Sequence, residues 1–312
     1  MCYHPRIECS KVATFQTTKS LRSELWFVNS SPLEQAILGY AAKYTARYKM
    51  ELYALAIEGN HVQFPARFPK ANRAHFMRDF NSSIARAVPR YQPSHGGGRF
   101  WKRRYSAEYL PGNEDIEEQF FYTVLQPVQD GLIDQISDYP GYNCFEDAIS
   151  GRARVFKSVR WKEYNDARRW KKKVSIEKFT DEHELSFTRL PGYEELTPEA
   201  YARTMREKLK ERTKRIIEGR GSKKALGREA LKRVKPGSLP QHTKTSSIND
   251  HRPRILSKDP ERRKKGKAWY FSIYFKYREV SEKYRNGDPL VKFPDGTYKP
   301  PLFTVGYKKS IL

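Results

Sequence analysis

Two short stretches of the sequence hold side chains whose types and spacing could do chemistry together. His61 and Gln63 are two residues apart in a predicted strand, and Tyr122 and Gln126 are four apart in a predicted helix. Each spacing puts its two side chains on one face, so the two stretches can converge on one site. A phenol can act as a nucleophile, and an imidazole as a metal ligand or proton carrier. The competing interpretation is structural, because a lone histidine or a helix aromatic usually belongs to the core.

The elements that position these residues follow from apolar spacing and turn signals. The run 11–19 is rich in β-branched and aromatic residues, which predicts a strand. Ser31 offers an N-cap hydroxyl with proline and glutamate in the turn after it, which predicts a helix over 32–49. The next elements are a strand over 52–57, a turn at 58–60, a strand over 61–68, a helix from an N-cap at Asn72 to near Pro89, a flexible link at 96–98, a strand over 99–110 and a helix from 114 that carries Tyr122.

The order of these elements predicts the fold class. Strand, helix, strand, strand, helix, strand and a further helix is the split βαβ order of an α+β, ferredoxin-like antiparallel sheet with flanking helices. The length of this unit agrees with one domain over residues 11–150.

Pro127 directly follows Gln126 within the helix that carries Tyr122. A proline inside a helix removes a hydrogen bond and clashes with the preceding turn, at about 3 kcal/mol. Two outcomes stay open: a kink that aims Gln126, or a helix that ends early.

The charge of the chain points to a polyanionic partner. The 312 residues carry a formal net charge of +24, and the surplus lies in the second half. Residues 1–150 hold 17 Lys and Arg against 16 Asp and Glu, whereas residues 151–312 hold 43 against 20. Nucleic acid is the usual partner of such a surface, ahead of an anionic membrane.

Residues 151–312 are predicted to form a basic extension, partly helical or disordered, that contacts nucleic acid. Cationic and aromatic side chains alternate around Arg160, Trp161 and Lys162, which suits phosphate contact and base stacking on a single strand. We expect a helix over 198–218, poor order near 219–267, and an aromatic C-terminal segment that docks on the first domain.

Cysteine content and hydropathy favour a reducing, aqueous compartment. Cys2, Cys9 and Cys144 have no metal-ligand spacing and do not form an even disulfide set. The sequence has no apolar run of about 18 residues and no N-terminal pattern of a signal peptide. We therefore expect a cytoplasmic protein with free thiols.

Three segments resemble the single-tyrosine HUH transposases of the IS200-like superfamily, and in particular the REP-associated tyrosine transposases. The run 58–63 (EGNHVQ) is similar to their Asn-His-Val-His strand, with Gln63 in place of the second histidine. The run 122–133 (YTVLQPVQDGLI) is similar to their nucleophile helix, which has an amide four residues after the tyrosine and then Pro-Val. The run 99–105 (RFWKRRY) lies where the group has a tryptophan-and-arginine strand, so the resemblance covers residues 11–150.

The resemblance implies an enzyme that nicks and joins single-stranded DNA. Tyr122 would be the nucleophile and would form a 5′-phosphotyrosine link with release of a 3′-hydroxyl. His61, Gln63 and Gln126 would hold one divalent ion, with Mg²⁺ or Mn²⁺ favoured because the amide oxygens are hard ligands. The DNA would be a hairpin-forming repeat, and the protein a monomer or homodimer. The residues expected to contact DNA are Arg99, Trp101, Lys102, Arg103, Arg104, Arg160, Trp161 and Lys162.

Two other functions remain compatible with the sequence. The ferredoxin-like sheet is also a common platform for single strands, so a non-catalytic or domesticated nucleic-acid-binding protein is the main alternative. An RNA-processing factor is the third, and it would bind RNA more tightly than DNA of the same sequence.

Overall fold

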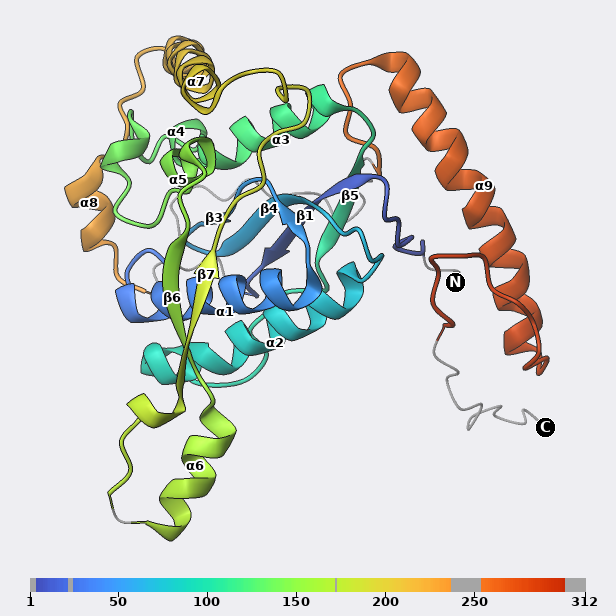
Figure 1. Cartoon of the computed structure of the whole chain (residues 1–312), viewed down its shortest axis with the longest axis horizontal. Coiled ribbons are helices and arrows are strands. Elements are labelled where there is room, and N and C mark those ends of the chain that lie inside the picture. Colours follow the sequence, from blue (N-terminus) through green and yellow to red (C-terminus); the bar gives the residue numbers. More distant parts are fainter. Residues whose placement is uncertain (1–3, 22–24, 172, 237–253, 301–312) are drawn as a thin grey trace, which may run out of the picture.

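The chain is built around an antiparallel sheet with the strand order β2-β4-β1-β5, in which β3 also pairs with β4 (Figure 1). The computed structural model describes residues 4–21, 25–171, 173–236 and 254–300. If β2 and β3 are taken as one interrupted strand, this is the ferredoxin-like order, and the predicted α+β class is confirmed. The elements of this first part are β1 (Ala13–Lys19), α1 (Ser31–Tyr48), β2 (Glu51–Leu52), β3 (Ala56–Ile57), β4 (His61–Arg67), α2 (Arg73–Tyr91), β5 (Ser106–Leu110), α3 (Asn113–Val124), α4 (Gln126–Gln129) and α5 (Phe145–Ser150).

Helices cover both faces of the sheet. Figure 1 shows α1 and α2 on one side of the strands and α3 on the other. On the first side, Phe64 of β4 contacts Phe76 and Phe80 of α2, with ring centroids 5.7 and 6.2 Å apart. Because neighbouring residues of a strand point to opposite faces, His61 and Gln63 lie on the α3 side.

The predicted strand over 52–57 is two short strands. Leu52 pairs with Ala66, and Ala56 pairs with Gln63. The chain therefore advances four residues from Leu52 to Ala56 while its partner strand, β4, advances three. One extra residue opposite a regular strand is a β-bulge. The bulge lies beside Pro65, which has no N–H to donate, although its carbonyl still accepts from Tyr53 N at 3.1 Å.

The capping contacts at the start of both early helices differ from the prediction. The N-cap of α1 is Ser30 and not Ser31, and its hydroxyl accepts from Leu33 N at 3.3 Å. Glu34 takes no part in a capping box and instead accepts from Tyr142 N at 2.7 Å. Asn72 precedes α2 as predicted, but its side chain makes no capping bond.

The role expected of Asn72 is performed by Glu8, from a distant part of the chain. The Glu8 carboxylate accepts from Arg73 N at 2.9 Å and from Ala74 N at 3.2 Å, the first two backbone donors of α2. Its other partner is the buried Arg73 guanidinium, 3.5 Å away. At its other end α2 passes through Pro89 and continues to Tyr91. The strand predicted over 99–110 is also shorter, because only 106–110 pairs regularly with β1.

Residues beyond 150 pack against the same core. The hairpin of β6 and β7 lies on α1, where Gly39 makes the close approach possible: a Cβ there would lie 2.0 Å from the Lys157 carbonyl oxygen. Phe156, Leu185 and Met205 are buried with the apolar residues of the sheet layer. The division of the chain near residue 150 stays a prediction. The elements of this part are β6 (Arg154–Val159), α6 (Trp161–Trp170), β7 (Thr180–Leu185), α7 (Pro198–Arg220), α8 (Arg228–Arg233) and α9 (Pro260–Arg285).

The aromatic C-terminal segment contacts the β5 edge of the sheet. Tyr109 of β5 donates its backbone N–H to Arg254 O at 2.7 Å, and its ring lies 5.1 Å from that of Trp269 on α9. Tyr270 is buried beside Tyr109. The span 219–267, predicted to be poorly ordered, contains α8 and the start of α9, while residues 237–253 of it lie outside the described residues.

Candidate active site and basic cavity

Polar side chains cross three strands on the sheet face that α3 covers. The pairing register joins Lys19 to His61 and Thr17 to Gln63 between β1 and β4, and Phe15 to Glu108 between β1 and β5. Directly paired residues of antiparallel strands share a face, so these six side chains lie on one side of the sheet. His61, Gln63, Thr17 and Glu108 are all buried. A buried polar strip on a sheet is unusual and marks this face as the candidate site.

Tyr122 lies over the same face. Its ring meets that of Phe15 edge-on, with centroids 5.8 Å apart, and the residue keeps 39 % of its surface exposed. The preceding residues Phe120 and Phe121 are 1 % exposed and fill the core. The helix thus buries two aromatic side chains and presents the third to solvent above the strip.

The two predicted stretches converge through a pair of amides. Gln63 Nε2 on β4 donates to Gln126 Oε1 at 3.2 Å, across 63 residues of sequence. Gln126 Nε2 in turn donates to Asp130 Oδ2 at 2.9 Å. The three side chains form one hydrogen-bonded line from the sheet to the end of α4.

The chain between Tyr122 and Gln126 is interrupted at the proline. The helix α3 ends at Val124, Leu125 has φ −95° and ψ 2°, and α4 begins at Gln126. Since Pro127 lacks the N–H that a continuous helix would use, the outcome is an early end followed by a short second helix. Gln126 is therefore placed by the start of α4 and not by an unbroken helical turn.

The neighbouring Asn60 side chain orients the His61 ring. His61 Nδ1 lies 2.9 Å from Asn60 Oδ1, within hydrogen-bond distance. A histidine oriented by a hydrogen bond at its second nitrogen is the usual arrangement of a metal-ligating imidazole.

The donor set fits a hard divalent ion, held in large part by neutral oxygen. His61 offers one nitrogen, and Gln63 and Gln126 each offer an amide oxygen once the Gln63 amide turns. Within the described part of the chain, no group of three or more His, Cys, Asp or Glu side chains could hold a metal. Amide oxygens suit Mg²⁺ or Mn²⁺ better than softer ions.

A buried carboxyl lies close behind this site. Glu58, in the turn before His61, is 3 % exposed, and burial together with the charge of Asp130 raises the pKa of its carboxyl to about 8. Tyr139 donates its hydroxyl to Ile57 O at 2.9 Å and to Glu58 Oε2 at 3.4 Å. At neutral pH the protonated form of Glu58 therefore predominates.

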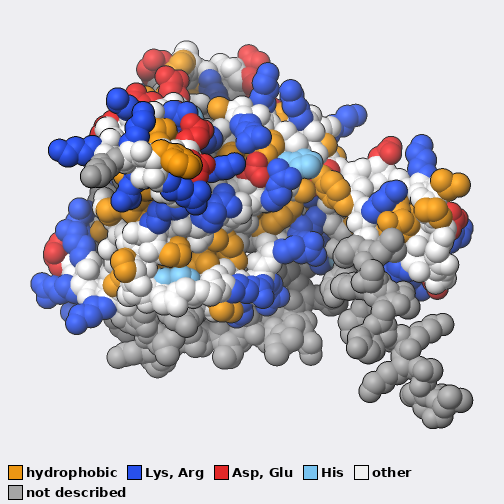
Figure 2. Space-filling view, turned by 90° about the horizontal axis from the view of Figure 1, so that it is seen from below, with side chains coloured by type: hydrophobic (Ala, Val, Ile, Leu, Met, Phe, Trp, Pro, Cys, Tyr) orange, Lys and Arg blue, Asp and Glu red, His pale blue; other side chains and the backbone are white. Residues whose placement is uncertain are grey.

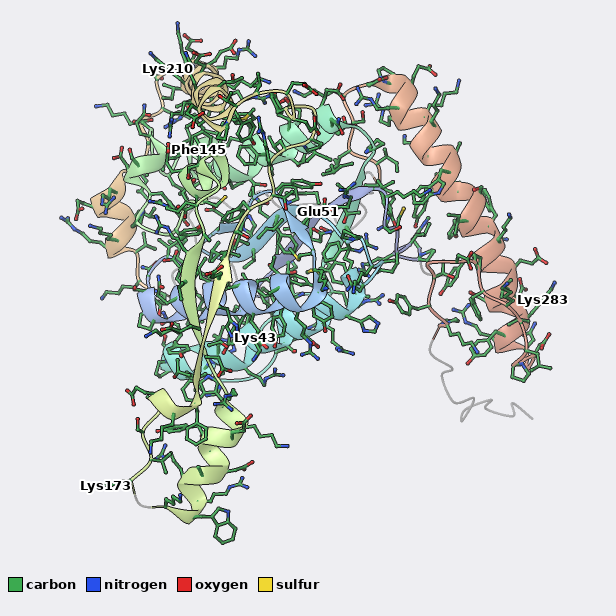
Figure 3. The ribbon with its side chains drawn as sticks, in the orientation of Figure 1. Lys43, Glu51, Phe145, Lys173, Lys210 and Lys283 are labelled. Atoms are coloured by element: carbon green, nitrogen blue, oxygen red, sulfur yellow. The ribbon has the colours of Figure 1, made fainter. Side chains whose placement is uncertain are left out.

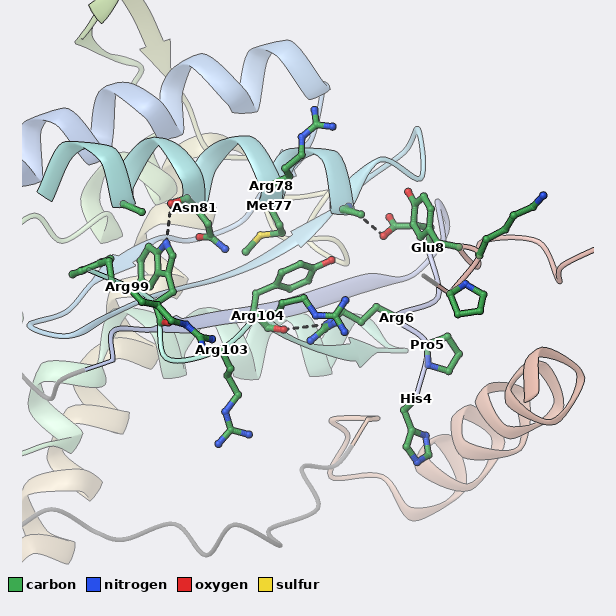
Figure 4. A pocket seen from close by; sticks show the side chains of 18 of the residues that line it. His4, Pro5, Arg6, Glu8, Met77, Arg78, Asn81, Arg99, Arg103 and Arg104 are labelled. Atoms are coloured by element: carbon green, nitrogen blue, oxygen red, sulfur yellow. Dashed lines mark hydrogen bonds between the residues drawn. The ribbon is translucent and has the colours of Figure 1, made fainter. Parts of the chain in front are cut away.

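A basic cavity of about 900 Å³ lies at the β5 edge on the α2 side of the sheet (Figure 4). Met77 and Asn81 of α2 line it, so it opens on the face opposite Tyr122. Glu8 is the one carboxylate among the described lining residues, and it is already paired with Arg73. The cations that line the cavity are Arg6, Arg78, Arg99, Arg103, Arg104, Arg285 and Lys299.

The arginines of this cavity are close enough to oppose one another. Arg6 donates to Tyr105 O at 3.0 Å, and its guanidinium lies 4.8 Å from the centre of the Tyr105 ring. Burial, and then the neighbouring charge of Arg104, lower the pKa of Arg6. A cluster of like charges that is held in place by the fold is stabilised by a bound anion.

The residues predicted to bind DNA fall at two separate places. Arg99, Trp101, Arg103 and Arg104 line the basic cavity, where the Trp101 indole donates to Asn81 O at 2.8 Å. Lys102 is exposed beside it, and its backbone N–H donates to Lys19 O at 3.0 Å. The other three residues, Arg160, Trp161 and Lys162, line a smaller cavity of about 450 Å³ against Lys43 and Arg90.

In the smaller cavity the charges are partly compensated. Arg160 forms ion pairs with Glu163 and with Asp181, the latter at 3.2 Å. Arg90 lies over the Trp161 ring, 4.3 Å from its centre, so this ring already has a cation on one face. Of the three predicted contacts here, Lys162 is the exposed one.

Positive charge extends well beyond these cavities. Figure 2 shows Lys and Arg side chains spread over one face of the molecule, with Asp and Glu in fewer places. Lys173 on the projecting arm of β6, α6 and β7, Lys210 on α7 and Lys283 on α9 lie at three outer parts of the molecule (Figure 3). Trp170 at the end of α6 is 88 % exposed.

Several residues of interest were not singled out by the sequence. Asp130 could have been found, because it follows Gln126 by the same four residues that separate Gln126 from Tyr122. Glu108 carried no signal, since its place beside Phe15 depends on strand register. Arg6, Arg285 and Lys299 reach the cavity from both ends of the chain, which no local pattern indicates.

Comparisons with known proteins return partial structural similarity. No protein-family model and no curated protein matches the sequence. A solved structure of a REP-associated tyrosine transposase bound to a REP hairpin aligns with a TM-score of 0.40 and 16 % identity, over 47 % of this chain and 85 % of the other. A Deinococcus radiodurans protein described as a transposase aligns with a TM-score of 0.27 and 15 % identity, over 34 % of this chain and 85 % of the other.

In the part of the chain that the structure describes, no helix has the length and apolar character needed to cross a membrane.

Proposed function

We propose that the protein is a metal-dependent endonuclease and strand transferase for single-stranded DNA, a transposase that works through a covalent link to Tyr122. The observation that carries the proposal is the placement of this residue: a partly exposed tyrosine near the end of α3 lies on the same sheet face as His61, Gln63 and Gln126. An exposed phenol beside a set of ligand-type side chains has no evident role in the core.

The proposed reaction exchanges one phosphodiester bond for another. The Tyr122 hydroxyl loses its proton to solvent, and its oxygen attacks the phosphorus of the DNA backbone. The bond from phosphorus to the 3′-oxygen breaks, the 3′-oxygen leaves with the electron pair and takes up a proton, and a 5′-phosphotyrosine remains. Attack by a 3′-hydroxyl on this ester reverses the exchange and joins strands without an external energy source.

The chain's own residues would position the substrate and one divalent ion. His61, Gln63 and Gln126 would hold Mg²⁺ or Mn²⁺, which offsets phosphate charge when it is bound. The first part, residues 11–150, would carry the reaction, and the basic extension over 151–312 would add contacts to a hairpin-forming DNA repeat. We place the protein in the cytoplasm, as a monomer or a homodimer. The proposed DNA contacts are Arg99, Trp101, Lys102, Arg103, Arg104, Arg160, Trp161 and Lys162.

The covalent link gives a direct test. The purified protein is incubated with labelled single-stranded DNA from the flanks of its gene, with Mn²⁺, Mg²⁺ or EDTA, and the products are separated on a denaturing gel. We expect a protein–DNA adduct that requires the metal and is lost in Tyr122→Phe. Tyr284→Phe is the matched control, because it removes the hydroxyl of a half-buried tyrosine on α9 that lies outside the basic cavity, and it should leave the adduct intact.

The same experiment separates the alternatives. Salt-sensitive DNA binding without an adduct in any metal would favour a non-catalytic single-strand-binding protein, for which the neutral amide at Gln63 is the supporting observation. Tighter binding to RNA than to DNA of equal sequence would favour an RNA-processing factor.

A further inference from the structure

Building on the proposed function, we propose that Asp130 is a positioning residue for the ligand Gln126. Its carboxylate holds the Gln126 amide with the oxygen turned toward Gln63, and it supplies the negative charge that the neutral ligands lack. Asp130 lies outside the three residues that the sequence resemblance assigns to the metal.

The orientation of the Gln126 amide follows from what a carboxylate can accept. An ionised aspartate has acceptors and no donor, so the side of the amide that faces Asp130 must be its nitrogen. The observed bond, Gln126 Nε2 to Asp130 Oδ2 at 2.9 Å, has this polarity. The amide oxygen is then forced to the opposite side, where it lies 3.2 Å from Gln63 Nε2.

The backbone around Asp130 is closed and holds the carboxylate in reach. Asp130 N donates to Gln126 O at 2.9 Å, and Gly131 N donates to Val128 O at 3.1 Å. Gly131 has φ +69°, a conformation that favours glycine and turns the chain away directly after Asp130. The Asp130 backbone is thus held at the end of the same short helix that starts with Gln126.

Charge is the second contribution. An imidazole and two amide oxygens bring no negative charge to a dication, whereas most sites for Mg²⁺ include at least one carboxylate. An outer carboxylate that is hydrogen-bonded to a ligand raises the basicity of that ligand and fixes its orientation. Asp130 can do both for Gln126 because its carboxylate already accepts a hydrogen bond from the Gln126 amide nitrogen.

The test measures metal binding without DNA. Mn²⁺ affinity is determined by isothermal titration and by the loss of the free Mn²⁺ signal in electron paramagnetic resonance, for the full chain and for Asp130→Ala, Asp130→Asn and Asp134→Asn. The last is the control: Asp134 follows in the same segment, is 56 % exposed and pairs with Arg220 at 2.9 Å. It loses the same charge but has no bond to a ligand.

We expect Asp130→Ala to bind Mn²⁺ about 10- to 100-fold more weakly, the range for removal of an outer-shell partner. Asp130→Asn keeps an acceptor without the charge and should lie between this variant and the parent, while Asp134→Asn should bind as the parent does. Thermal unfolding of all four proteins should show that each is folded at the temperature of the titration.

Parent-like affinity in Asp130→Ala, or an equal loss in Asp134→Asn, would overturn the inference. A chain that binds Mn²⁺ with the expected dependence on Asp130 but forms no adduct would instead overturn the proposed function alone. A parent chain that binds no Mn²⁺ would overturn both.

Discussion

At the scale of single residues, the buried Glu58 makes the stability of the fold depend on pH. Its pKa, about 8 in the folded chain, is raised above the ordinary value of 4.5. The folded protein therefore holds this proton more tightly, and the stability that it contributes is complete below about pH 4.5 and is lost as the pH rises toward 8. Between these two pH values the folded state binds one proton more than the unfolded state. The free energy of unfolding therefore falls by about 1.4 kcal/mol per pH unit.

The Glu58→Gln variant should remove this dependence. Urea unfolding between pH 5.5 and 7.5 is expected to show a shallower fall of the unfolding free energy in Glu58→Gln than in the parent. Burial also raises the pKa of Glu34, to about 7. Glu34 therefore makes the unfolding free energy fall with rising pH in the variant and in the parent alike. Equal slopes for the variant and the parent would show that Glu58 is ionised in the folded state.

The candidate site itself could be predicted from the sequence where its geometry depends on local periodicity. His61 and Gln63 share a face through strand alternation, and the bond from Gln63 to Gln126 brings the helix end to that face. Glu108 and Thr17 share the face as well, but their place depends on the pairing of distant strands. Local spacing predicts neighbours within an element, whereas register between elements is set by the whole sheet.

At the scale of elements, the sequence predicts which segments are helices and strands better than where they end. The helix over 32–49 and the strand over 61–68 are present within one residue of their predicted bounds, as α1 and β4. The strand over 52–57 is divided because of a bulge opposite Pro65, and bulges depend on the partner strand. The helix after Asn72 starts at the predicted place, but its first N–H groups bond to Glu8.

The substitution Glu8→Gln should therefore destabilise the fold. It removes the charge that compensates Arg73, whose side chain is 2 % exposed, and a buried charge without its partner costs about 3–5 kcal/mol. Urea unfolding at pH 7 measures the difference. Glu261→Gln is the control, because Glu261 also lies in the first turn of a helix, α9, but is exposed. A drop in stability for Glu8→Gln no larger than for the control would contradict the claim that the Glu8 charge compensates Arg73.

At the scale of the whole molecule, the excess of basic residues predicts a polyanionic partner but not where it binds. The basic cavity joins the N-terminal segment, α2, the loop before β5 and α9, and these are brought together only by the fold. The runs around Trp101 and Trp161 are both aromatic and basic, yet they line separate cavities. The composition could thus indicate nucleic acid, while the path of a strand depends on the tertiary arrangement.

Paired substitutions test the contribution of the basic cavity. Arg103→Gln with Arg104→Gln should weaken binding of single-stranded DNA and reduce the slope of log K against log salt by about 0.7 for each phosphate that the protein no longer neutralises. Arg203→Gln with Lys210→Gln removes the same charge from exposed positions on α7 and should change the slope less. Fluorescence anisotropy over a range of salt concentrations measures both. Identical slopes in the two double variants would show that only total charge matters.

The most direct measurement of the central claim is the identity of the residue that becomes linked to DNA. After reaction with single-stranded DNA in Mn²⁺, the protein is digested with nuclease and protease, and the nucleotide-bearing peptide is sequenced by mass spectrometry. The account predicts a phosphodiester-linked nucleotide on Tyr122. A nucleotide on any other residue, or none on a chain that has cleaved its DNA, would contradict it.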